Sequence, residues 1–537
     1  MQVVKSDVIV VGSGLAGIAA AIESARAGAR VALLTTGTLC GGSSFSKHTW
    51  GLGMVTPTDL DAELRRSPES LAYAMESVGA HQNNPQLVDV LIADASSAVA
   101  FLSSLGATVS EPSNPNQREF VPCFDTRVRG WHGFHAWDSR AALMQAVCGI
   151  EGIQVFEHTR ALSFLQEDGR ATPIRGVMAC GPASCPSSRL TSVELLRFEA
   201  PSVVLATGGL ASVYEHSFGG EGYLAAAMAY DAGATFTNIE FLQLMLAFCS
   251  HPMGAICNEK LWRHASVLDE NGSSVFQYLG VSPDKERAAL EAHSWHGPFT
   301  TARESRLLEL AIQRAEAAGH HAYLHLSEAF LDGAHPEFVD TYLDWLREKG
   351  ANPKEPVEIT LYAHSSNGGI DIDADGATTV PGLFAAGECA GGVHGADRIG
   401  GLASVTALVF GRRAGIAAAC YAREHKVTSS AARPSSPMLP VDNGPFVCRE
   451  VGKLMGAHCL VNRTDEGLRG VLADLDHLIQ DHFGSEQFVD ESGDPRSISE
   501  SVRARAKSIA AHLMAEAMLS RRESLGSHHR SDIDSFF

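Results

Sequence analysis

The chain has 537 residues, of which 45% are hydrophobic and 19% charged, and its formal net charge is −20. This length exceeds one ordinary hydrophobic core, so about two or three domains are expected, and the composition is that of a globular protein, not a disordered one. The negative charge argues against a nucleic acid partner, although a site inside such a protein can still be locally positive for a small anionic substrate.

The eleven cysteines occur singly, with no CxxC pair. The sequence therefore carries no zinc, iron–sulfur or c-type haem signature, and we expect no metal. Free thiols suit a reducing compartment. The N-terminal "MQVVKSD" runs straight into a strand without a signal-peptide pattern, and the apolar runs look too short to cross a membrane. We expect a cytoplasmic protein without a membrane segment.

The first predicted unit is a strand–helix–strand motif over residues 6–36. The turn "VGSGLAG" places Gly12, Gly14 and Gly17 in the GxGxxG spacing, directly after a strand and at the start of a helix. Glycines there allow a tight turn and bring backbone N–H groups close to a pyrophosphate. The second strand ends in Thr35 instead of an acidic ribose ligand, so we expect a larger dinucleotide than NAD, with other anchors.

The middle of the chain alternates helices and strands before its composition changes. The pattern predicts an amphipathic helix over 84–105, a buried strand over 203–209 and an alanine-rich helix over 223–232. Residues 241–345 contain more Trp, His and Arg and less glycine, which indicates an inserted domain. A strand pattern returns at 357–363.

A second glycine-rich segment follows. "GLFAAGECAGG" (382–392) is a short strand running into a turn that carries Glu388, and "GGLASVTALVFGRRAG" (400–415) opens a helix whose N-terminus can face an anion. Two such turns, distant in sequence, suit a long dinucleotide held at both ends. Residues 426–445 read as a Ser/Pro-rich linker, and the rest of the chain is helical in pattern.

These motifs resemble the flavoprotein family of succinate dehydrogenase, fumarate reductase and L-aspartate oxidase. "NIEFLQL" (238–244), "HSSNGGIDIDADG" (364–376) and "RRESLGSHHR" (521–530) have family counterparts in the same order. The resemblance implies an α/β fold. Its parts would be a Rossmann-like FAD-binding domain (1–240 and 346–425), an inserted α+β capping domain (241–345), the linker and a C-terminal helical domain (446–537).

The resemblance also implies bound FAD and a set of cofactor residues. The segments that match the family's FAD-binding motifs contribute Gly12, Ser13, Gly14, Ala16, Gly17, Thr35, Gly42, Ser43, Ser44, Trp50, Gly51, Ala206, Thr207, Gly208, Glu221, Gly387, Glu388, Arg398, Gly401, Ala403 and Ser404. Glu221 stands where relatives carry Asp. His48 invites comparison with the histidine that bonds covalently to FAD in respiratory relatives, but its spacing differs, so we expect FAD to be held without a covalent bond.

Two arginines are implied as catalytic. In the family, the arginine at the position of Arg398 anchors a substrate carboxylate beside the flavin, a task that suits the guanidinium fork; the alternative is an ion pair with Asp397. Arg306 resembles the arginine that transfers a proton, with Arg303 as the competing assignment and a solvated pair with Glu304 as the structural alternative. Because a guanidinium is a reluctant acid, it needs a proton relay and a dry site.

Two further residues complete the implied catalytic set. His364 occupies the place of a family histidine that donates to a substrate carboxylate. Glu259 matches the acid of a family Thr-Glu pair whose Thr is Asn258 here.

The chain departs from the family at the other end of the substrate. Met245 replaces the histidine that holds the second carboxylate of a four-carbon diacid, and a thioether cannot donate a hydrogen bond; His251 is a remote substitute. The segment "RGWHGFHAWDS" (129–139) lacks the glutamate by which L-aspartate oxidase reads an amino group. The aromatic residues of this segment are Trp131, His132, Phe134 and His135. They predict either a pocket for a substrate with one carboxylate and an apolar portion, or a part of the hydrophobic core.

The predicted site residues are compatible with three functions. The first is an FAD-dependent reductase acting on a C=C bond next to a carboxylate, with hydride passing between flavin N5 and carbon and an arginine as proton donor. The second is an amine oxidase of the L-aspartate oxidase type that forms an imine and hydrogen peroxide. The third is an electron-transfer flavoprotein subunit whose own chemistry is lost. The partner expected is a small carboxylate substrate, and a separate electron-transfer protein is a candidate second partner.

Overall fold

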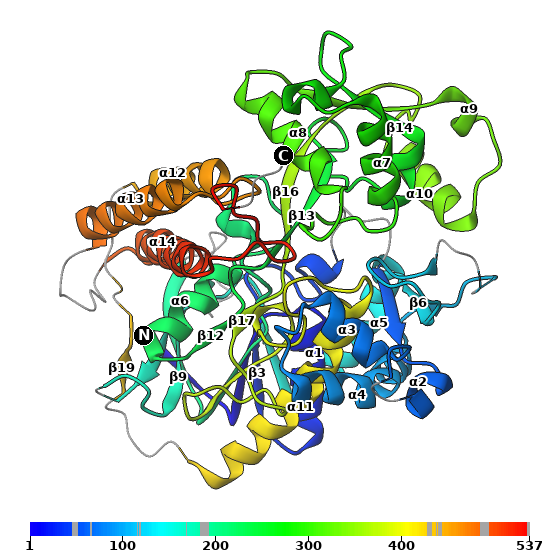
Figure 1. Ribbon diagram of the computed structural model, residues 1–537. Helices are drawn as coiled ribbons and strands as arrows, with labels where there is room; N and C mark the ends of the chain where they lie inside the picture. Colours follow the sequence, from blue (N-terminus) through cyan, green and yellow to red (C-terminus); the bar gives the residue numbers. More distant parts are fainter. Residues whose placement is uncertain are drawn as a thin grey trace.

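The computed structural model describes residues 1–45, 52–64, 67–114, 116, 120–167, 169–182, 193–426, 432–436, 438, 443–483 and 493–533. His48, Trp50 and Gly51 lie outside the described residues, as does half of the predicted linker. Figure 1 shows mixed helices and strands, with one lobe built around the N-terminal strands and a second lobe formed by the middle of the chain.

A five-stranded parallel sheet forms the centre of the larger lobe, in the order β18-β11-β2-β3-β7. Its strands are β18 (Leu383–Ala385), β11 (Ser202–Leu205), β2 (Val8–Val11), β3 (Val31–Leu34) and β7 (Ile153–Phe156). All four residues of β2, β3 and β11 are buried, as expected for a parallel sheet covered on both faces. With α1 (Leu15–Arg26), β2 and β3 form the predicted strand–helix–strand unit.

Helix α11 (Leu402–Glu424) packs along α1, although 387 residues separate their first positions in the sequence. Glycines permit this contact: a Cβ on Gly411 would lie 2.5 Å from the carbonyl oxygen of Ala16, and one on Gly415 would lie 2.4 Å from that of Ala20. The two glycine-rich turns that precede these helices are thereby brought to one end of the parallel sheet.

The expectation that no apolar run approaches membrane-spanning length was wrong. Helices α4 (Pro85–Ser104) and α11 are long and apolar enough to cross a membrane by length and composition alone. Their apolar windows are 44% and 61% buried within the fold, and the two helices also contact each other. Burial against neighbouring elements therefore accounts for much of their apolar character.

Two further sheets and several helices surround the central sheet. A five-stranded sheet has the order β1-β10-β9-β8-β19, with β1 (Gln2–Lys5), β10 (Val193–Glu199), β9 (Ile174–Pro182), β8 (Arg160–Gln166) and β19 (Arg433–Pro434). A three-stranded sheet joins β4 (Leu52–Thr56), β6 (Gly130–Phe134) and β5 (Val109–Ser110). The remaining helices of this lobe are α2 (Asp59–Leu64), α3 (Leu71–Val78), α5 (Ala136–Cys148) and α6 (Gly222–Ala232).

The second lobe contains a four-stranded antiparallel sheet in the order β13-β16-β15-β14, drawn in green at the top of Figure 1. Its strands are β13 (Leu242–Phe248), β16 (Val357–Ser366), β15 (Ala322–Leu326) and β14 (Ala265–Leu268). Its helices are α7 (Pro283–His293), α8 (Arg306–Ala317), α9 (Glu328–Leu331) and α10 (Glu337–Glu348). Strands β12 (Phe236–Thr237) and β17 (Gly369–Ile370) pair with each other. Along the chain, β12 comes just before β13 and β17 just after β16, where the chain enters and leaves the second lobe.

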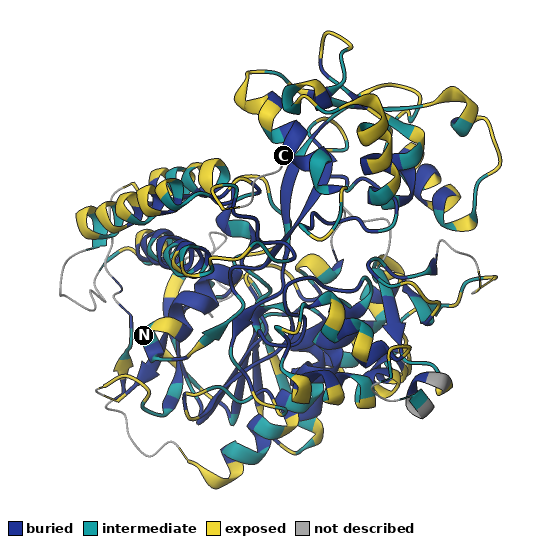
Figure 2. Ribbon diagram, viewed as in Figure 1, coloured by how far each residue is buried: buried dark blue, intermediate teal, exposed yellow. Residues whose placement is uncertain are grey.

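Three helices follow in the C-terminal part: α12 (Gly444–His458), α13 (Asp465–Phe483) and α14 (Pro495–Ser520). Helix α14 packs against α6, α12 and α13. Figure 2 shows α13 exposed on its outer side and α14 largely buried. The final segment is fixed by buried polar contacts, since Arg463 Nη1 lies 2.6 Å from His528 Nδ1.

Candidate active site

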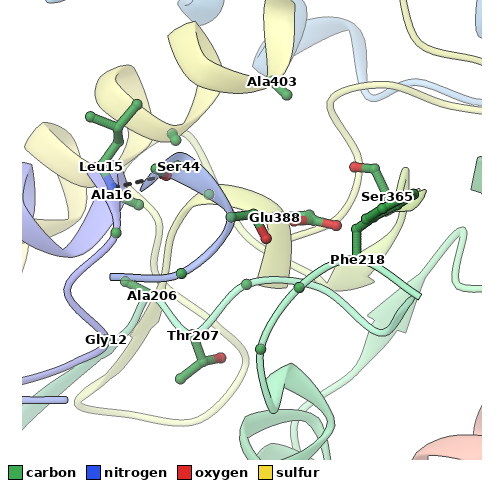
Figure 3. Close-up of a pocket in the computed structure, with 18 of the residues that line it drawn as sticks. Gly12, Leu15, Ala16, Ser44, Ala206, Thr207, Phe218, Ser365, Glu388 and Ala403 are labelled. Atoms are coloured by element: carbon green, nitrogen blue, oxygen red, sulfur yellow. Dashed lines mark hydrogen bonds between the residues drawn. The ribbon is translucent and has the colours of Figure 1, made fainter. Parts of the chain in front are cut away.

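A cavity of about 430 Å³ lies where both glycine-rich turns meet the second lobe. One end is formed by the turns that follow β2 and β11, and the other by residues of β13, β16 and the turn before α11. In Figure 3, Gly12, Leu15 and Ala16 lie at one side of the cavity, Glu388 near its middle, and Phe218 and Ser365 at the opposite side. The cavity is therefore elongated and bounded by segments distant in sequence.

The first turn requires glycine at two positions. Gly12 has φ +110°, and a Cβ on it would lie 2.2 Å from the carbonyl oxygen of Ala206; a Cβ on Gly17 would lie 1.9 Å from the carbonyl oxygen of Gly12. Helix α1 then begins with Gly14 as its N-cap. The Leu15 N–H donates to Ser44 Oγ at 3.3 Å, and Leu15 and Ala16 of the first turn line the cavity. This turn fits the backbone approach that a pyrophosphate needs.

The second turn also leads into a helix, which runs parallel to α1. Helix α11 begins after Gly401, which has φ +79° and makes no side-chain cap. Ala403 and Ser404, in the first turn of α11, line the cavity. The first turns of two helices thus line one elongated space, an arrangement that suits a long dinucleotide.

Most residues predicted to hold the cofactor line this cavity. Gly17 does not, because it packs against the first turn itself. The predicted residues that line it are Gly12, Ser13, Gly14, Ala16, Thr35, Gly42, Ser43, Ser44, Ala206, Thr207, Gly208, Glu221, Gly387, Glu388, Arg398, Gly401, Ala403 and Ser404. The hydroxyl of Thr207 is buried without a hydrogen bond to the described residues, which leaves a polar group for a ligand. The cavity therefore fits FAD.

Glu221 is held by cations. Arg160 Nε lies 2.8 Å from its Oε2, and Arg503 Nε lies 2.6 Å from its Oε1. Arg160 also donates to Ser499 of α14. Sequence analysis identified Glu221 but missed Arg160, which lines the cavity and comes from a strand without any recognisable motif.

Arg398 faces the far end of the cavity and is 9% exposed. Its Nη2 donates to Gln243 Oε1 at 2.6 Å, while its Nε is buried without a hydrogen bond to the described residues. Burial lowers the pKa of its guanidinium, and the nearby Glu388 carboxylate opposes this effect. The described residues show no ion pair between Arg398 and Asp397, so the cation is available to an anion in the cavity.

His364 reaches the same space through an irregularity in its strand. Gln243 pairs with Ser365 and Leu244 with Ala363, which leaves His364 as an extra residue in a β-bulge. Consequently the adjacent His364 and Ser365 both line the cavity. Burial and the charge of Arg398 lower the pKa of His364 to about 3, so its imidazole is neutral at physiological pH. Its buried Nδ1 makes no hydrogen bond to the described residues.

Glu388 approaches the middle of the cavity from the second glycine-rich turn. Its Oε1 accepts a hydrogen bond from the Ser366 N–H at 2.9 Å. Burial raises the pKa of Glu388, although this hydrogen bond and the charge of Arg398 oppose the increase. A Cβ on Gly209 would lie 2.4 Å from Glu388 Oε1, so a larger residue there would displace the Glu388 carboxylate.

Glu259 and Met245 form the wall opposite the first turn. Cys123 Sγ donates to Glu259 Oε1 at 3.4 Å, and Lys260 Nζ lies 3.9 Å from the same oxygen. Burial and the charge of Glu259 raise the pKa of the Cys123 thiol to about 12, so it stays protonated. Met245 lies against Gly297, where an added Cβ would be 2.7 Å from the Met245 methyl carbon. Cys123 was not predicted as a site residue, because it belongs to no recognisable sequence motif.

The two candidate proton-donating arginines differ in position. Arg306 is the first residue of α8, and its Nη1 donates to the Thr301 carbonyl at 2.8 Å. Arg303 lies in the preceding turn, so the two do not share a helix face. Neither is among the described residues that line the cavity. The charge of Arg303, however, lowers the pKa of Asp397, the neighbour of Arg398.

The aromatic segment 129–139 divides between two environments. Trp131, Phe134 and His135 line a second cavity of about 270 Å³, whereas His132 Nε2 lies 3.2 Å from Thr56 Oγ1 and is not among its lining residues. Phe134 is 1% exposed and also packs edge-on against Phe45. The segment thus contributes to both a pocket and the core.

His251, the remote substitute for the missing histidine, lies elsewhere. Its Nε2 is 2.7 Å from the carbonyl oxygen of Lys349, and it is exposed. Among the described residues, no cluster of His, Cys, Asp or Glu could hold a metal ion.

Comparisons with known proteins agree with this geometry. The family model described as "FAD binding domain" matches residues 7–403, and that described as "Fumarate reductase flavoprotein C-term" matches residues 448–535. The chain is 27% identical to one subunit of the CoM/CoB fumarate reductase of Methanothermobacter marburgensis, covering 99% of this chain and 95% of that protein. It is 28% identical to L-aspartate oxidase of Caulobacter vibrioides, covering 98% and 93%. The E. coli quinol fumarate reductase flavoprotein shares its fold, with a TM-score of 0.73, 22% identity and coverage of 99% and 92%.

A testable consequence arises from Asp397. It is 4% exposed, accepts from Thr300 Oγ1 at 2.7 Å, and burial raises its pKa from 3.8 to about 8. Between these values the folded protein keeps a proton that the unfolded chain releases, so this group lowers stability as pH rises, by about 1.4 kcal/mol per pH unit at most. Asp397→Asn should therefore gain stability relative to the wild type between pH 5 and pH 8, measured by thermal unfolding of the FAD-loaded protein.

The matched control is Asp474→Asn, which changes an exposed carboxyl on α13. Its stability difference from the wild type should stay constant over that pH range. A constant difference for Asp397→Asn as well would mean that Asp397 is ionised in the folded protein near neutral pH.

Proposed function

This chain belongs to the FAD-binding flavoprotein family that includes fumarate reductase, succinate dehydrogenase and L-aspartate oxidase, and is an FAD-dependent oxidoreductase; from that premise we propose that it reduces a C=C bond next to a carboxylate. The observation that carries this proposal is the buried guanidinium of Arg398, which faces the cavity with one amide partner. A carboxylate is the anion that its free N–H groups match best.

We propose that the two glycine-rich turns hold the FAD at two places, with the N-terminus of α1 at its pyrophosphate and that of α11 near its flavin ring. In this proposal the FAD is held without a covalent bond, so no attachment through His48 is needed. When bound, FAD supplies the hydride that passes from flavin N5 to one carbon of the double bond.

The residues of the chain then bind, orient and protonate the substrate. Arg398 and the neutral His364 bind its carboxylate, while Gln243 fixes the guanidinium. Glu259 lies on the opposite wall and orients the rest of the molecule. The adjacent carbon requires a proton, and a general acid in such a site contributes roughly 10²–10⁴-fold to the rate.

For that acid we propose Arg303 ahead of Arg306. Arg306 already donates to the Thr301 carbonyl, whereas the electrostatic effect of Arg303 reaches Asp397. Asp397 carries a proton near neutral pH and accepts from Thr300, so it is suited to return a proton to Arg303 after turnover. This arrangement would supply the relay that a weakly acidic guanidinium needs.

The second candidate is an amine oxidase of the L-aspartate oxidase type, favoured by the similarity to the Caulobacter vibrioides enzyme. Against this candidate, segment 129–139 lacks the glutamate by which L-aspartate oxidase recognises the amino group of its substrate. A third role, as an electron-transfer subunit without its own chemistry, draws on the likeness to one component of a fumarate reductase. In the first and third roles we propose a separate electron-transfer partner and a cytoplasmic location.

The domain roles follow from the same proposal. Residues 1–240 and 346–425 would form the FAD-binding domain, residues 241–345 a cap over the flavin, and residues 446–537 the C-terminal helical domain, with 426–445 as linker. Strand β16, which completes the four-stranded sheet of the second lobe, would lead from the cap back to the FAD-binding domain.

The direct test is anaerobic photoreduction of the FAD, followed by addition of unsaturated acids. We expect a 2-enoate to reoxidise the flavin with formation of the saturated acid, measured by flavin absorbance and product analysis. L-aspartate in air should give no stoichiometric hydrogen peroxide. Peroxide from L-aspartate would establish the oxidase, and a flavin inert to both substrate classes would favour the electron-transfer role.

The acid is tested with a matched pair of variants, Arg303→Met and Arg306→Met. Arg303→Met should lower kcat by at least about 100-fold while FAD stays bound, because it removes the proton donor but no proposed cofactor contact. Arg306→Met should lower kcat by less than about tenfold. The opposite ranking in stopped-flow reoxidation would assign the acid to Arg306.

Substrate length is tested at Met245. Met245→His restores a donor beside the cavity, and a charge-assisted hydrogen bond contributes about 1.5–3 kcal/mol. We therefore expect kcat/KM for fumarate to rise about ten- to hundredfold. Met245→Leu keeps the volume without adding a donor and should leave the fumarate rate unchanged. Equal rates for both variants would show that Met245 does not determine diacid selectivity.

A further inference from the structure

The second cavity, of about 270 Å³, shares a wall with the cofactor cavity. Six residues line both spaces: Leu52, Gly53, Cys123, Glu259, Gly400 and Gly401. Gly400 and Gly401 directly precede α11, two residues after Arg398. The second cavity therefore opens beside the place where the proposed substrate carboxylate and double bond would lie.

The inner part of this second cavity is aromatic. The ring centroids of Phe120 and Trp131 are 5.0 Å apart, and those of Phe120 and Phe338 are 5.8 Å apart with an edge-on geometry. Phe120 is 4% exposed and Phe134 1%. Rings at these spacings offer faces and edges to a further aromatic group. The volume corresponds to roughly nine water molecules at about 30 Å³ each, which is room for a substituted benzene ring.

The outer part is polar. His135 Nε2 lies 2.8 Å from Ser110 Oγ, and Glu337 accepts from Ser113. Thr341, on the exposed side of α10, also lines this part. An occupant thus meets an apolar surface next to the reaction site and hydrogen-bonding groups farther out.

Two of the residues that line both cavities are glycines in close contact with side chains. A Cβ on Gly53 would lie 2.9 Å from Trp131 Nε1, and one on Gly400 would lie 3.1 Å from the Cys123 Cβ. Glycine at both positions leaves space where any side chain would obstruct it. A flat group passes such an opening more readily than a branched one.

We propose that the second cavity binds the aryl substituent of the substrate, so that the enzyme acts on 3-arylprop-2-enoates. This inference rests on the proposed reduction of a C=C bond next to a carboxylate. With the carboxylate at Arg398, the ring extends past Glu259 and Cys123 to Trp131. The reaction consumes two electrons from the reduced flavin and two protons, and converts the C=C bond into a saturated 3-arylpropanoate.

The test measures binding separately from turnover. The saturated acids 3-phenylpropanoate and butanoate are titrated into the oxidised, FAD-loaded protein by calorimetry. Wild type should bind 3-phenylpropanoate at least about tenfold more tightly, because only that acid buries a ring. Thr341→Trp, which directs an indole into the cavity from an exposed helix position, should abolish this preference.

The matched control is Glu348→Trp, which places the same ring on α10 at an exposed position outside the cavity lining. It should keep the wild-type preference. In parallel, reoxidation of the photoreduced flavin by 3-phenylprop-2-enoate and but-2-enoate gives the ratio of their kcat/KM values, which should fall at least about tenfold in Thr341→Trp alone.

The outcomes separate the two proposals. Equal binding of both saturated acids by wild type, or an unchanged preference in Thr341→Trp, would overturn the aryl pocket even if enoates are reduced. Selective binding of 3-phenylpropanoate without reduction of any enoate would support the pocket and overturn the proposed reaction.

Discussion

The site depends on a guanidinium that is buried without an ion pair to any of the described residues. Arg398 is 9% exposed, and its one hydrogen bond to a described side chain goes to the neutral amide of Gln243. Burying a charge is unfavourable unless it is paired, so this cation favours an anion in the cavity. The same charge helps to keep His364 neutral, which leaves its imidazole able to both donate and accept a hydrogen bond.

Packing of α1 against α11 gives the site its shape. Because Gly411 contacts Ala16 and Gly415 contacts Ala20, the two helices run parallel in backbone contact, and residues of the first turn of each line one cavity. The β-bulge at His364 then brings the second lobe to the same space. The cofactor end and the substrate end of the cavity are thus built from four segments that are far apart in sequence. Each of these segments requires either a glycine or an irregular backbone conformation at one position.

The sequence predicted those parts whose signal is local. The GxGxxG turn, the strand–helix–strand unit and the residues around Glu388 and Arg398 follow from short patterns, and they line the cavity as expected. The relative positions of Arg303 and Arg306 did not follow from such a pattern. Helix α8 begins only at Arg306, and the sequence periodicity does not mark that boundary. Cys123, Gln243 and Arg160 reach the cavity through tertiary packing, which no spacing along the chain encodes.

The departures from the family affect one end of the substrate only. Arg398 and His364, which we propose bind the carboxylate, keep the family's residue types. Met245 instead stands where the family carries a hydrogen-bond donor, and Glu259 also lines the second cavity together with Trp131. A random loss of function would affect both ends. A retained anion site next to an aromatic space is better explained by a change of substrate than by loss of chemistry.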